Sequence, residues 1–362
     1  MSDQIPFHIQ EEIMKRLPVK SLVQFRCVSK AWKSSIDSSE FIAAHSHRRH
    51  TQPHYLLVSY ENPLVEEDYV LFSRCYTNDD SFPQQSSVPT LSQSVKQLIL
   101  PSVVGSSQGL LCLYGSHPNL QTHMAVLWNL SIRKSIAVLM PDFGVCPYTR
   151  DPIEPSIGFG VCPVTNDPKI VAMTQLSEFM IYTLNTGKWR SLPTNLPSRT
   201  QRFFFSVVTD RFIYWEVELK DLKTIMSFDL ISETFELIDL PESLARRDPW
   251  VVSISKLRDS LAIVQYGDDY NSSIVWMMEV GARKSFTKLF TIPYVNVVGF
   301  SKNGLPIVTV DDDDSDMTKL VVYETNSEHN KVLEICELPY HFFVHSYMET
   351  LLLLGRSDYT SY

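Results

Sequence analysis

The chain has 362 residues and a net charge of −9, and 44% of its residues are hydrophobic. This length exceeds a typical single domain, so one large domain plus a small module is the expected organisation. The acidic balance argues against a nucleic-acid partner, which would require a basic face. No apolar run approaches the roughly 18 residues of a membrane span, and the N-terminus enters a polar, amphipathic helix without a signal peptide, so no membrane partner is expected.

The cysteines indicate a reducing compartment. All six are scattered without a C-x-x-C pair: Cys27, Cys75, Cys112, Cys146, Cys162 and Cys336. Most lie in apolar surroundings, as in Leu111-Cys112-Leu113, which suits reduced, buried thiols. We therefore expect a cytoplasmic and/or nuclear location. In such a compartment the sequons at Asn129-Leu130-Ser131 and Asn271-Ser272-Ser273 would be chance occurrences.

The first 45 residues predict short helices. Apolar residues recur at every fourth position, which aligns them on one helix face: Ile5, Ile9, Ile13 and Leu17. Pro18 is predicted to end this helix, because proline removes a backbone donor. Leu22 and Phe25 make a second apolar face, and Ser29 is the predicted N-cap of a third helix that carries Trp32.

Helices of this size bury too little surface to fold robustly alone. Two interpretations follow: a helical cap on the rest of the chain, or a docking module completed by a partner's surface. Two runs, Arg16–Leu22 and Phe25–Trp32, resemble the plant version of the F-box motif. The departures are Ile5, where the family usually has leucine, and His8, where an acidic residue is common.

The resemblance implies that these helices bind the Skp-type adaptor of a cullin-RING ubiquitin ligase, and through it cullin and the RING protein. The residues predicted to divide between the core of the module and the adaptor interface are Ile5, Pro6, Ile9, Glu12, Ile13, Leu17, Pro18, Val19, Leu22, Phe25, Arg26, Val28 and Trp32.

Beyond the predicted F-box (1–45), the polar and basic stretch 46–54 is interpreted as a connector, and 55–362 as the large domain. The runs Tyr55–Tyr60 and Tyr69–Phe72 predict a hairpin within 55–76. Thr77–Ser94 is rich in Ser, Pro, Gln and Asp and is expected to form a long surface loop or a partly disordered segment.

A diverged repeat then follows, in which strand, polar turn and strand lead to a proline. The prolines recur every 46–52 residues: Pro141, Pro193, Pro241, Pro293 and Pro339. Hairpin turns keep the same period, at Gly109, Asp210-Arg211, Asp259-Ser260, Asn303-Gly304 and Glu349-Thr350. The repeats are predicted at about 98–141, 155–197, 203–241, 250–293 and 295–339. Such a period with several strands per unit is typical of a β-propeller.

The strand count also predicts how the ring closes. After Pro339 two strands are expected, near 342–344 and 351–354, and the hairpin within 55–76 would add two more to complete a blade. The predicted fold is therefore multidomain, a small all-α F-box module followed by an all-β propeller of six blades, with seven as the alternative. Closure of this kind removes exposed sheet edges.

This second region resembles the F-box-associated interaction domain of plant F-box proteins, a relative of kelch propellers. The matching parts are Gly105–Leu113, Trp128–Lys134 and the turn-to-proline units. The glycine doublets of true kelch repeats are missing from a chain with only 12 glycines. The resemblance therefore implies a kelch-like propeller and not a strict kelch protein.

Three patterns could carry chemistry. Gly105–Gly109 matches G-x-S-x-G, but a hydrolase needs a helix after the serine, and Leu110–Tyr114 predicts a strand. Histidines cluster at His45, His47, His50 and His54, without a cysteine or carboxylate frame for zinc. Asp311–Asp316 superficially resembles a calcium loop, but Thr318 occupies the glycine position of that frame, so an exposed acidic loop is expected. Neither a catalytic residue nor a metal or cofactor site is predicted.

The sequence thus predicts a non-enzymatic substrate-recognition subunit of a Skp–cullin–F-box ubiquitin ligase, with an unknown target protein on the propeller. Two alternatives stay open: an adaptor-bound scaffold without a role in degradation, and a propeller enzyme. The resemblance implies control of immune-receptor abundance or pollen-side recognition as biological settings, and the residues do not separate them.

Overall fold

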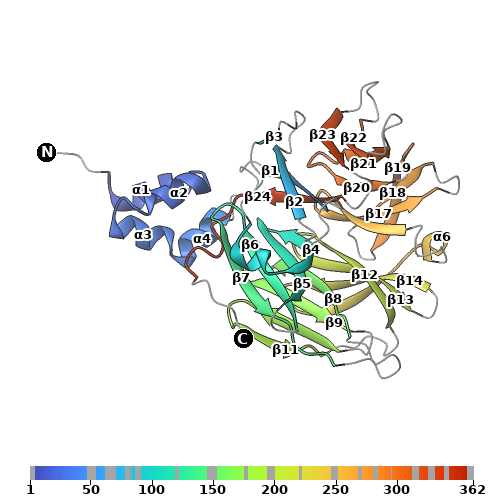
Figure 1. Ribbon diagram of the computed structural model, residues 1–362, viewed down its shortest axis with the longest axis horizontal. Helices are drawn as coiled ribbons and strands as arrows, with labels where there is room; N and C mark the ends of the chain where they lie inside the picture. The colour runs from blue at the N-terminus through green and yellow to red at the C-terminus, as the bar shows by residue number, and fades with distance from the viewer. Residues whose placement is uncertain are drawn as a thin grey trace.

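A computed structural model describes residues 5–46, 54–61, 71–77, 82, 84–85, 91–118, 122–144, 153–174, 178–193, 200–219, 222–245, 252–267, 271–279, 284–294, 296–311, 318–324, 331–337 and 342–356. In Figure 1 a group of short helices lies beside a ring of sheets. None of the described helices is long and apolar enough to cross a membrane.

Four helices form the N-terminal module: α1 (Phe7–Met14), α2 (Val19–Phe25), α3 (Lys30–Ile36) and α4 (Ser39–Ser46). Ser29 caps α3 as predicted, because its Oγ accepts a hydrogen bond of 3.1 Å from Trp32 N. The first helix ends at Met14, earlier than the predicted stop at Pro18, and Pro18 is instead the N-cap residue of α2. Proline suits the start of a helix because its missing N–H would have no partner there.

The rest of the chain forms a six-bladed propeller in which every blade is a four-stranded antiparallel sheet. The first blade is closed by strands from both ends of the chain: β1 (His54–Glu61), β2 (Leu71–Thr77), β3 (Gln84–Gln85) and β24 (Phe343–Met348). The second blade contains β4 (Ile99–Ser107), β5 (Leu110–His117), β6 (Thr122–Asn129) and β7 (Lys134–Leu139). The third contains β8 (Ser156–Val161), β9 (Pro168–Met173), β10 (Phe179–Thr183) and β11 (Lys188–Ser191).

The remaining blades follow in chain order. The fourth contains β12 (Thr200–Val208), β13 (Phe212–Leu219), β14 (Leu222–Asp229) and β15 (Phe235–Asp239). The fifth contains β16 (Val252–Leu257), β17 (Ser260–Tyr266), β18 (Ser273–Glu279) and β19 (Ser285–Ile292). The sixth contains β20 (Val297–Phe300), β21 (Pro306–Asp311), β22 (Thr318–Val322) and β23 (Lys331–Glu337). Two short helices, α5 (Gln93–Lys96) and α6 (Glu242–Ala245), lie between blades.

The six-blade prediction is confirmed, but the closing blade is built differently from the prediction. It takes one strand from the C-terminus and three from the N-terminal region, with the order β24-β1-β2-β3 (Figure 1). The expected C-terminal strand at 351–354 is a turn, and β3 lies inside the stretch predicted as a loop. The predicted turn-to-proline units correspond to the third and fourth strands of the blades. Pro141, Pro193 and Pro241 lie two residues after the last residue of β7, β11 and β15, respectively.

The blades pack face to face through apolar cores. Trp215 of β13 is fully buried and packs with Val171 and Ile181 of the preceding blade. The turns after the first and third strands of each blade lie on one face of the ring, because all neighbouring strands are antiparallel. The helical module lies at this face, where the segment after β24 contacts both the helices and the ends of β6 and β10.

Candidate functional site

An apolar surface on the helical module is the first candidate site. Large apolar side chains are exposed there, with exposed fractions of 53% for Ile5, 41% for Phe7, 43% for Ile9, 49% for Ile13 and 62% for Val28. We call these five residues the apolar face. The every-fourth-residue pattern from Ile5 to Ile13 therefore marks a side of the helix that faces away from the interior of the chain.

The module has its own interior beneath this face. Met14, Val19, Leu22, Ile36 and Phe41 are buried together. The predicted adaptor residues divide accordingly. Exposed members are Ile5, Pro6, Ile9, Glu12, Ile13, Pro18 and Val28, partly buried members are Leu17, Phe25, Arg26 and Trp32, and buried members are Val19 and Leu22. The exposed members can reach a partner directly, whereas the buried members can act only by shaping the module.

Polar contacts fix α1 against α3. Trp32 Nε1 donates a hydrogen bond of 2.9 Å to Gln10 Oε1, and Ser35 Oγ donates one of 2.5 Å to Glu11 Oε1. Trp32 also packs on Phe25 with ring centroids 5.3 Å apart. These contacts join α1 to α3 through the partly buried Gln10 and Glu11, while Ile9 and Ile13 remain exposed.

Arg26 and Asp37 form an ion pair within the module. Arg26 donates two hydrogen bonds to the carboxylate of Asp37, at 2.6 and 2.9 Å, and both side chains are about one quarter exposed. Such bidentate pairs are geometrically specific. Arg26, predicted at the adaptor interface, therefore already has a partner within the chain, and Glu12 pairs with Lys15 at 2.6 Å.

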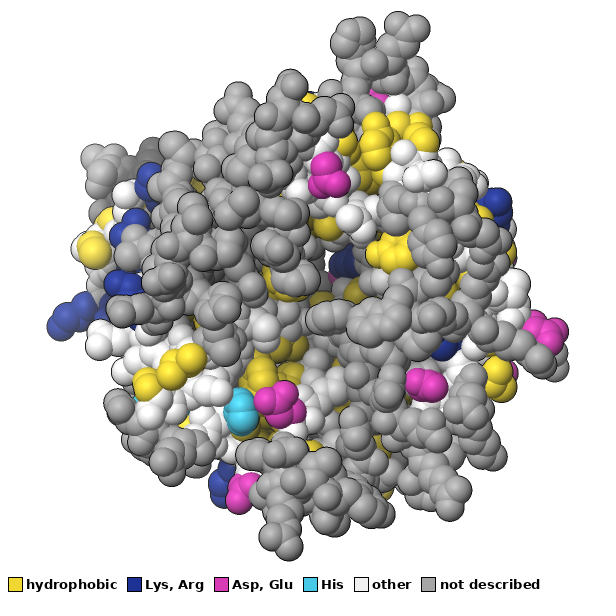
Figure 2. Space-filling view, turned by 45° about the vertical axis from the view of Figure 1, so that its right-hand side comes forward, with side chains coloured by type: hydrophobic (Ala, Val, Ile, Leu, Met, Phe, Trp, Pro, Cys, Tyr) yellow, Lys and Arg dark blue, Asp and Glu magenta, His cyan; other side chains and the backbone are white. Residues whose placement is uncertain are grey.

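The propeller offers a second candidate site, a central cavity of about 1190 Å³. Its walls are the innermost strands β4, β8, β12, β16, β20 and β24, and hydroxyl side chains line it at Ser102, Ser106, Ser156, Ser206, Ser253, Ser255 and Ser346. In Figure 2 the surface is hollowed near its centre, and atoms in the dark blue of Lys or Arg are visible inside the hollow. The described lining includes Lys256, which lies 3.6 Å from Asp210.

The G-x-S-x-G motif lies in this wall without the geometry of a nucleophile. Ser107 ends β4, and Gly109 makes a turn with φ of +80° into β5, so a strand follows as predicted and not a helix. The Ser107 hydroxyl accepts a hydrogen bond of 3.0 Å from Val161 N. A Cβ at Gly109 would lie 2.3 Å from Met348 O, so this glycine lets β24 approach closely.

The other two patterns fall partly outside the described residues. His45 is buried and its Nε2 lies 3.1 Å from Leu17 O, while His47 and His50 are outside the described part. Asp311 accepts a hydrogen bond of 3.1 Å from Thr318 Oγ1 across the ends of β21 and β22, and 312–317 are outside it. Among the residues that the structure describes, no group of three His, Cys, Asp or Glu side chains is placed to hold a metal ion.

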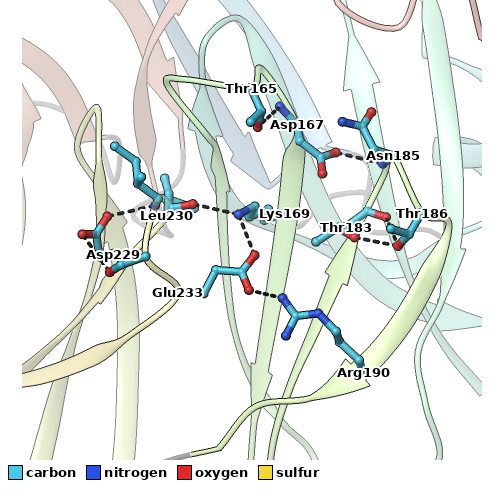
Figure 3. A network of polar contacts seen from close by, with 12 residues as sticks. Thr165, Asp167, Lys169, Thr183, Asn185, Thr186, Arg190, Asp229, Leu230 and Glu233 are labelled. Atoms are coloured by element: carbon cyan, nitrogen blue, oxygen red, sulfur yellow. Dashed lines mark hydrogen bonds and ion pairs between the residues drawn. The ribbon is translucent and has the colours of Figure 1, made fainter.

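A buried polar network joins the third and fourth blades (Figure 3). Lys169, only 6% exposed, donates hydrogen bonds of 2.8 Å to Leu230 O and 2.7 Å to Glu233 Oε1, and Glu233 also pairs with Arg190. These contacts join β9 and β11 of the third blade to the turn after β14 in the fourth, so the network connects the two blades. A lysine at the start of a strand gave no signal of this role in the sequence.

The turn that supplies Glu233 is itself fixed by Asp229. Burial alone would raise the pKa of this carboxyl, but hydrogen bonds from Arg211, from Ile231 N and from Ser232 outweigh burial and lower the pKa to about 2. Asp229 is therefore ionised at neutral pH and stabilises the turn.

Comparison with known proteins agrees with this architecture. Residues 2–43 match the family described as F-box domain, and residues 56–351 match the F-box associated beta propeller domain. The predicted domain boundaries, 1–45 and 55–362, were drawn from the residues alone and stay predictions.

Three relatives come from Arabidopsis thaliana. F-box protein At1g11270 is 27% identical over 76% of this chain and 87% of its own length, and F-box protein CPR1 is 24% identical over 98% and 90%. F-box/kelch-repeat protein At3g23880 is 27% identical over 80% and 79%.

Among solved structures, TolB from Acinetobacter baumannii superposes with a TM-score of 0.51 at 11% identity, covering 84% of this chain and 70% of TolB. This likeness concerns the fold alone. The two family matches cover the helical module and the propeller in the same order as the structure presents them. The chain therefore belongs to the F-box proteins whose F-box precedes an F-box-associated β-propeller domain.

Proposed function

We propose that this protein is a substrate-recognition subunit of a Skp–cullin–F-box ubiquitin ligase, which binds the Skp-type adaptor through its F-box and a target protein through its propeller. The observation that carries the proposal is the apolar face. Ile9 and Ile13 lie on adjacent turns of α1, both more than 40% exposed, above an interior that is already complete.

A face of this kind is costly to leave in water. Burial of each such side chain against an adaptor would contribute about 1.5–3 kcal/mol before the costs of association are subtracted. Contiguous exposed apolar residues commonly mark protein interfaces. The adaptor-binding role of the exposed members of the predicted set, and of Trp32 and Phe25 behind them, is part of the proposal.

The protein itself would be non-catalytic. Its propeller would hold a target close to the ubiquitin carrier that the cullin and RING protein recruit, which raises the effective concentration of target lysines. We also propose a cytoplasmic or nuclear location. In the described part of the chain Cys112 and Cys162 are buried free thiols, which suits a reducing compartment.

Co-purification of the full chain with a plant Skp-type adaptor tests the first step. The Ile9→Asp plus Ile13→Asp variant should lose about 100-fold in affinity, because two charges would be buried at the interface. Both positions are exposed in the free chain, so the variant should fold. Leu17→Asp plus Trp32→Asp is less suitable, since both side chains pack against the module's own core.

The matched control is Val164→Asp plus Ile231→Asp. These propeller side chains are 65% and 41% exposed, so the control adds the same charge to equally apolar surface. It should bind the adaptor like wild type. Undiminished adaptor binding by the Ile9→Asp plus Ile13→Asp variant would contradict the proposal.

A second experiment separates a degradation receptor from an adaptor-bound scaffold. Proximity labelling with and without a proteasome inhibitor identifies neighbours of the wild-type chain. Targets should accumulate on inhibition with wild type and should not respond with the Ile9→Asp plus Ile13→Asp variant. Neighbours whose half-lives are unchanged in both cases would favour the scaffold.

A further inference from the structure

The segment Glu349–Arg356, here called the C-terminal segment, lies between the F-box and the propeller. Its leucines face two different bodies. Leu351 and Leu354 belong to the F-box core with Met14 and Leu22. Leu352 and Leu353 belong to the core between the second and third blades. All four are at most 7% exposed, so the segment is an interior element of both parts.

Asn129 fixes this segment to the end of β6. Its side chain is fully buried, and Nδ2 donates hydrogen bonds of 2.9 Å to Thr350 O and 2.7 Å to Leu352 O. Its Oδ1 accepts one of 2.9 Å from Ser131 N. Both the nitrogen and the oxygen of the side-chain amide therefore have partners. Asn129, the first residue of a sequon expected to occur by chance, connects the end of β6 to the C-terminal segment.

Further polar contacts follow along the segment. Thr350 N donates to Ser131 Oγ at 3.2 Å, and Lys134 Nζ lies 3.5 Å from Leu354 O. Arg356 donates a hydrogen bond of 2.9 Å to Leu184 O and also pairs with the side chain of Asn185. The segment is therefore held by the second and third blades from Thr350 to Arg356.

The F-box side of the segment is equally specific. The Glu349 carboxylate lies close to Val19 N at the start of α2 and to Lys20. A Cβ at Gly355 would lie 3.3 Å from Asp37 O, the residue after α3. Among the described residues, the buried apolar cluster of the F-box has seven members, and two of them, Leu351 and Leu354, follow the last strand of the propeller.

We propose that the C-terminal segment is an integral part of the F-box: it completes the F-box core and fixes the apolar face relative to the propeller. The position of the F-box depends most on Leu351 as the positioning residue, because its side chain is 0% exposed and packs among F-box side chains. A module too small to enclose its own core is thereby completed within the chain before any adaptor binds. The adaptor part of this inference rests on the proposed function, and the structural part does not.

Two neighbouring leucines provide a matched test. Leu351→Ala and Leu352→Ala remove the same atoms from adjacent residues that face opposite bodies. Amide hydrogen exchange of the full chain reports local opening in each part separately. Leu351→Ala should lower protection of the F-box amides in α1–α3 at least tenfold while the amides of β17 and β18, in the distant fifth blade, keep wild-type protection. Leu352→Ala should lower protection in β5 and β9 first.

Adaptor affinity provides the functional readout. Leu351→Ala should weaken adaptor binding about tenfold, Leu352→Ala by less than threefold, and Leu351→Met should restore it because the volume is nearly conserved. Wild-type protection of α1–α3 in Leu351→Ala, or an equal loss of protection in F-box and fifth blade, would overturn the inference. The exchange result holds even if the wild-type chain binds no adaptor, so failure of the two proposals can be told apart.

Discussion

The F-box exposes five large apolar side chains between Ile5 and Val28, whereas the described part of the propeller exposes six that are scattered from Ile99 to Val332. In the propeller each blade covers its neighbour, and the pairing of β24 with β1 joins the C-terminal strand to the first blade. In the F-box one side of α1 has no cover. Large apolar side chains are thus mostly buried within the propeller itself, whereas the F-box leaves a group of them exposed on its surface.

The difference teaches where function lies in each part. The exposed apolar residues of the F-box lie within the first 28 residues, and leucines of the C-terminal segment are buried in the F-box core. The propeller instead contributes a rigid frame. Mutations that separate internal packing from surface chemistry should therefore act very differently in the two parts.

The largest expected effect is on the stability of the propeller. Gly158 on β8 lies against Trp215, and an added Cβ would meet Trp215 Cζ2 at 2.1 Å and Ile213 Cγ2 at 2.8 Å. Gly158→Ala should lower the free energy of unfolding by about 3 kcal/mol, because a fully buried tryptophan between blades has no room to move. Urea unfolding followed by circular dichroism measures this change.

Gly105→Ala is the control, since it places the same methyl group on another innermost strand. The nearest atom, Val208 Cγ1, would be 3.9 Å away, which is ordinary van der Waals contact. This variant should unfold within about 0.5 kcal/mol of wild type. Equal destabilisation by both glycine substitutions would show that the blades do not pack as described.

The second effect compares a buried residue with an exposed neighbour in the same helix, α1. Met14 is 1% exposed and its neighbour Ile13 is 49% exposed. Met14→Ala should reduce the free energy of local opening of the F-box by about 2–3 kcal/mol, because it leaves a cavity in the core. Ile13→Ala should change it by less than about 0.5 kcal/mol. Hydrogen exchange of α1 and α3 amides gives both values, and similar losses would mean that Ile13 is not free for a partner.

The fold was largely predictable because its signals are local and repeated. The spaced prolines and the turns at Gly109 and Asp210 mark strand ends through backbone chemistry that does not depend on distant residues. Ser29 as an N-cap is of the same kind. The motif Arg16–Trp32 was recognisable as an F-box, but the residues alone did not separate its exposed members from its buried ones.

The errors arise where long-range contacts decide. Leu351–Leu354 is a run of four apolar residues, which is typical of a buried strand, yet the outer two belong to one core, the middle two belong to another, and the run forms a turn. The role of Asn129 depends on carbonyl groups more than 200 residues away along the chain. Met14 was missed as a core residue because the helix pattern pointed to Ile5, Ile9 and Ile13, which the structure leaves exposed.

The smallest of these stability effects is a loss of stability at low pH, and it concerns β24, the strand that closes the ring. His345 lies on β24, where burial lowers its pKa from 6.5 to about 4, and its Nε2 has no hydrogen-bond partner among the residues that the structure describes. Between these two values the unfolded chain binds a proton that the folded chain excludes, so stability is retained above pH 6.5 and falls as the pH drops toward 4. At pH 5 this costs the folded state about 1–2 kcal/mol relative to pH 7. His345→Gln removes the titrating group, so thermal unfolding at pH 7 and pH 5 should show a smaller loss of stability in the variant than in wild type. An identical loss in both proteins would mean that His345 is not held in its neutral form on the closing strand of the folded chain.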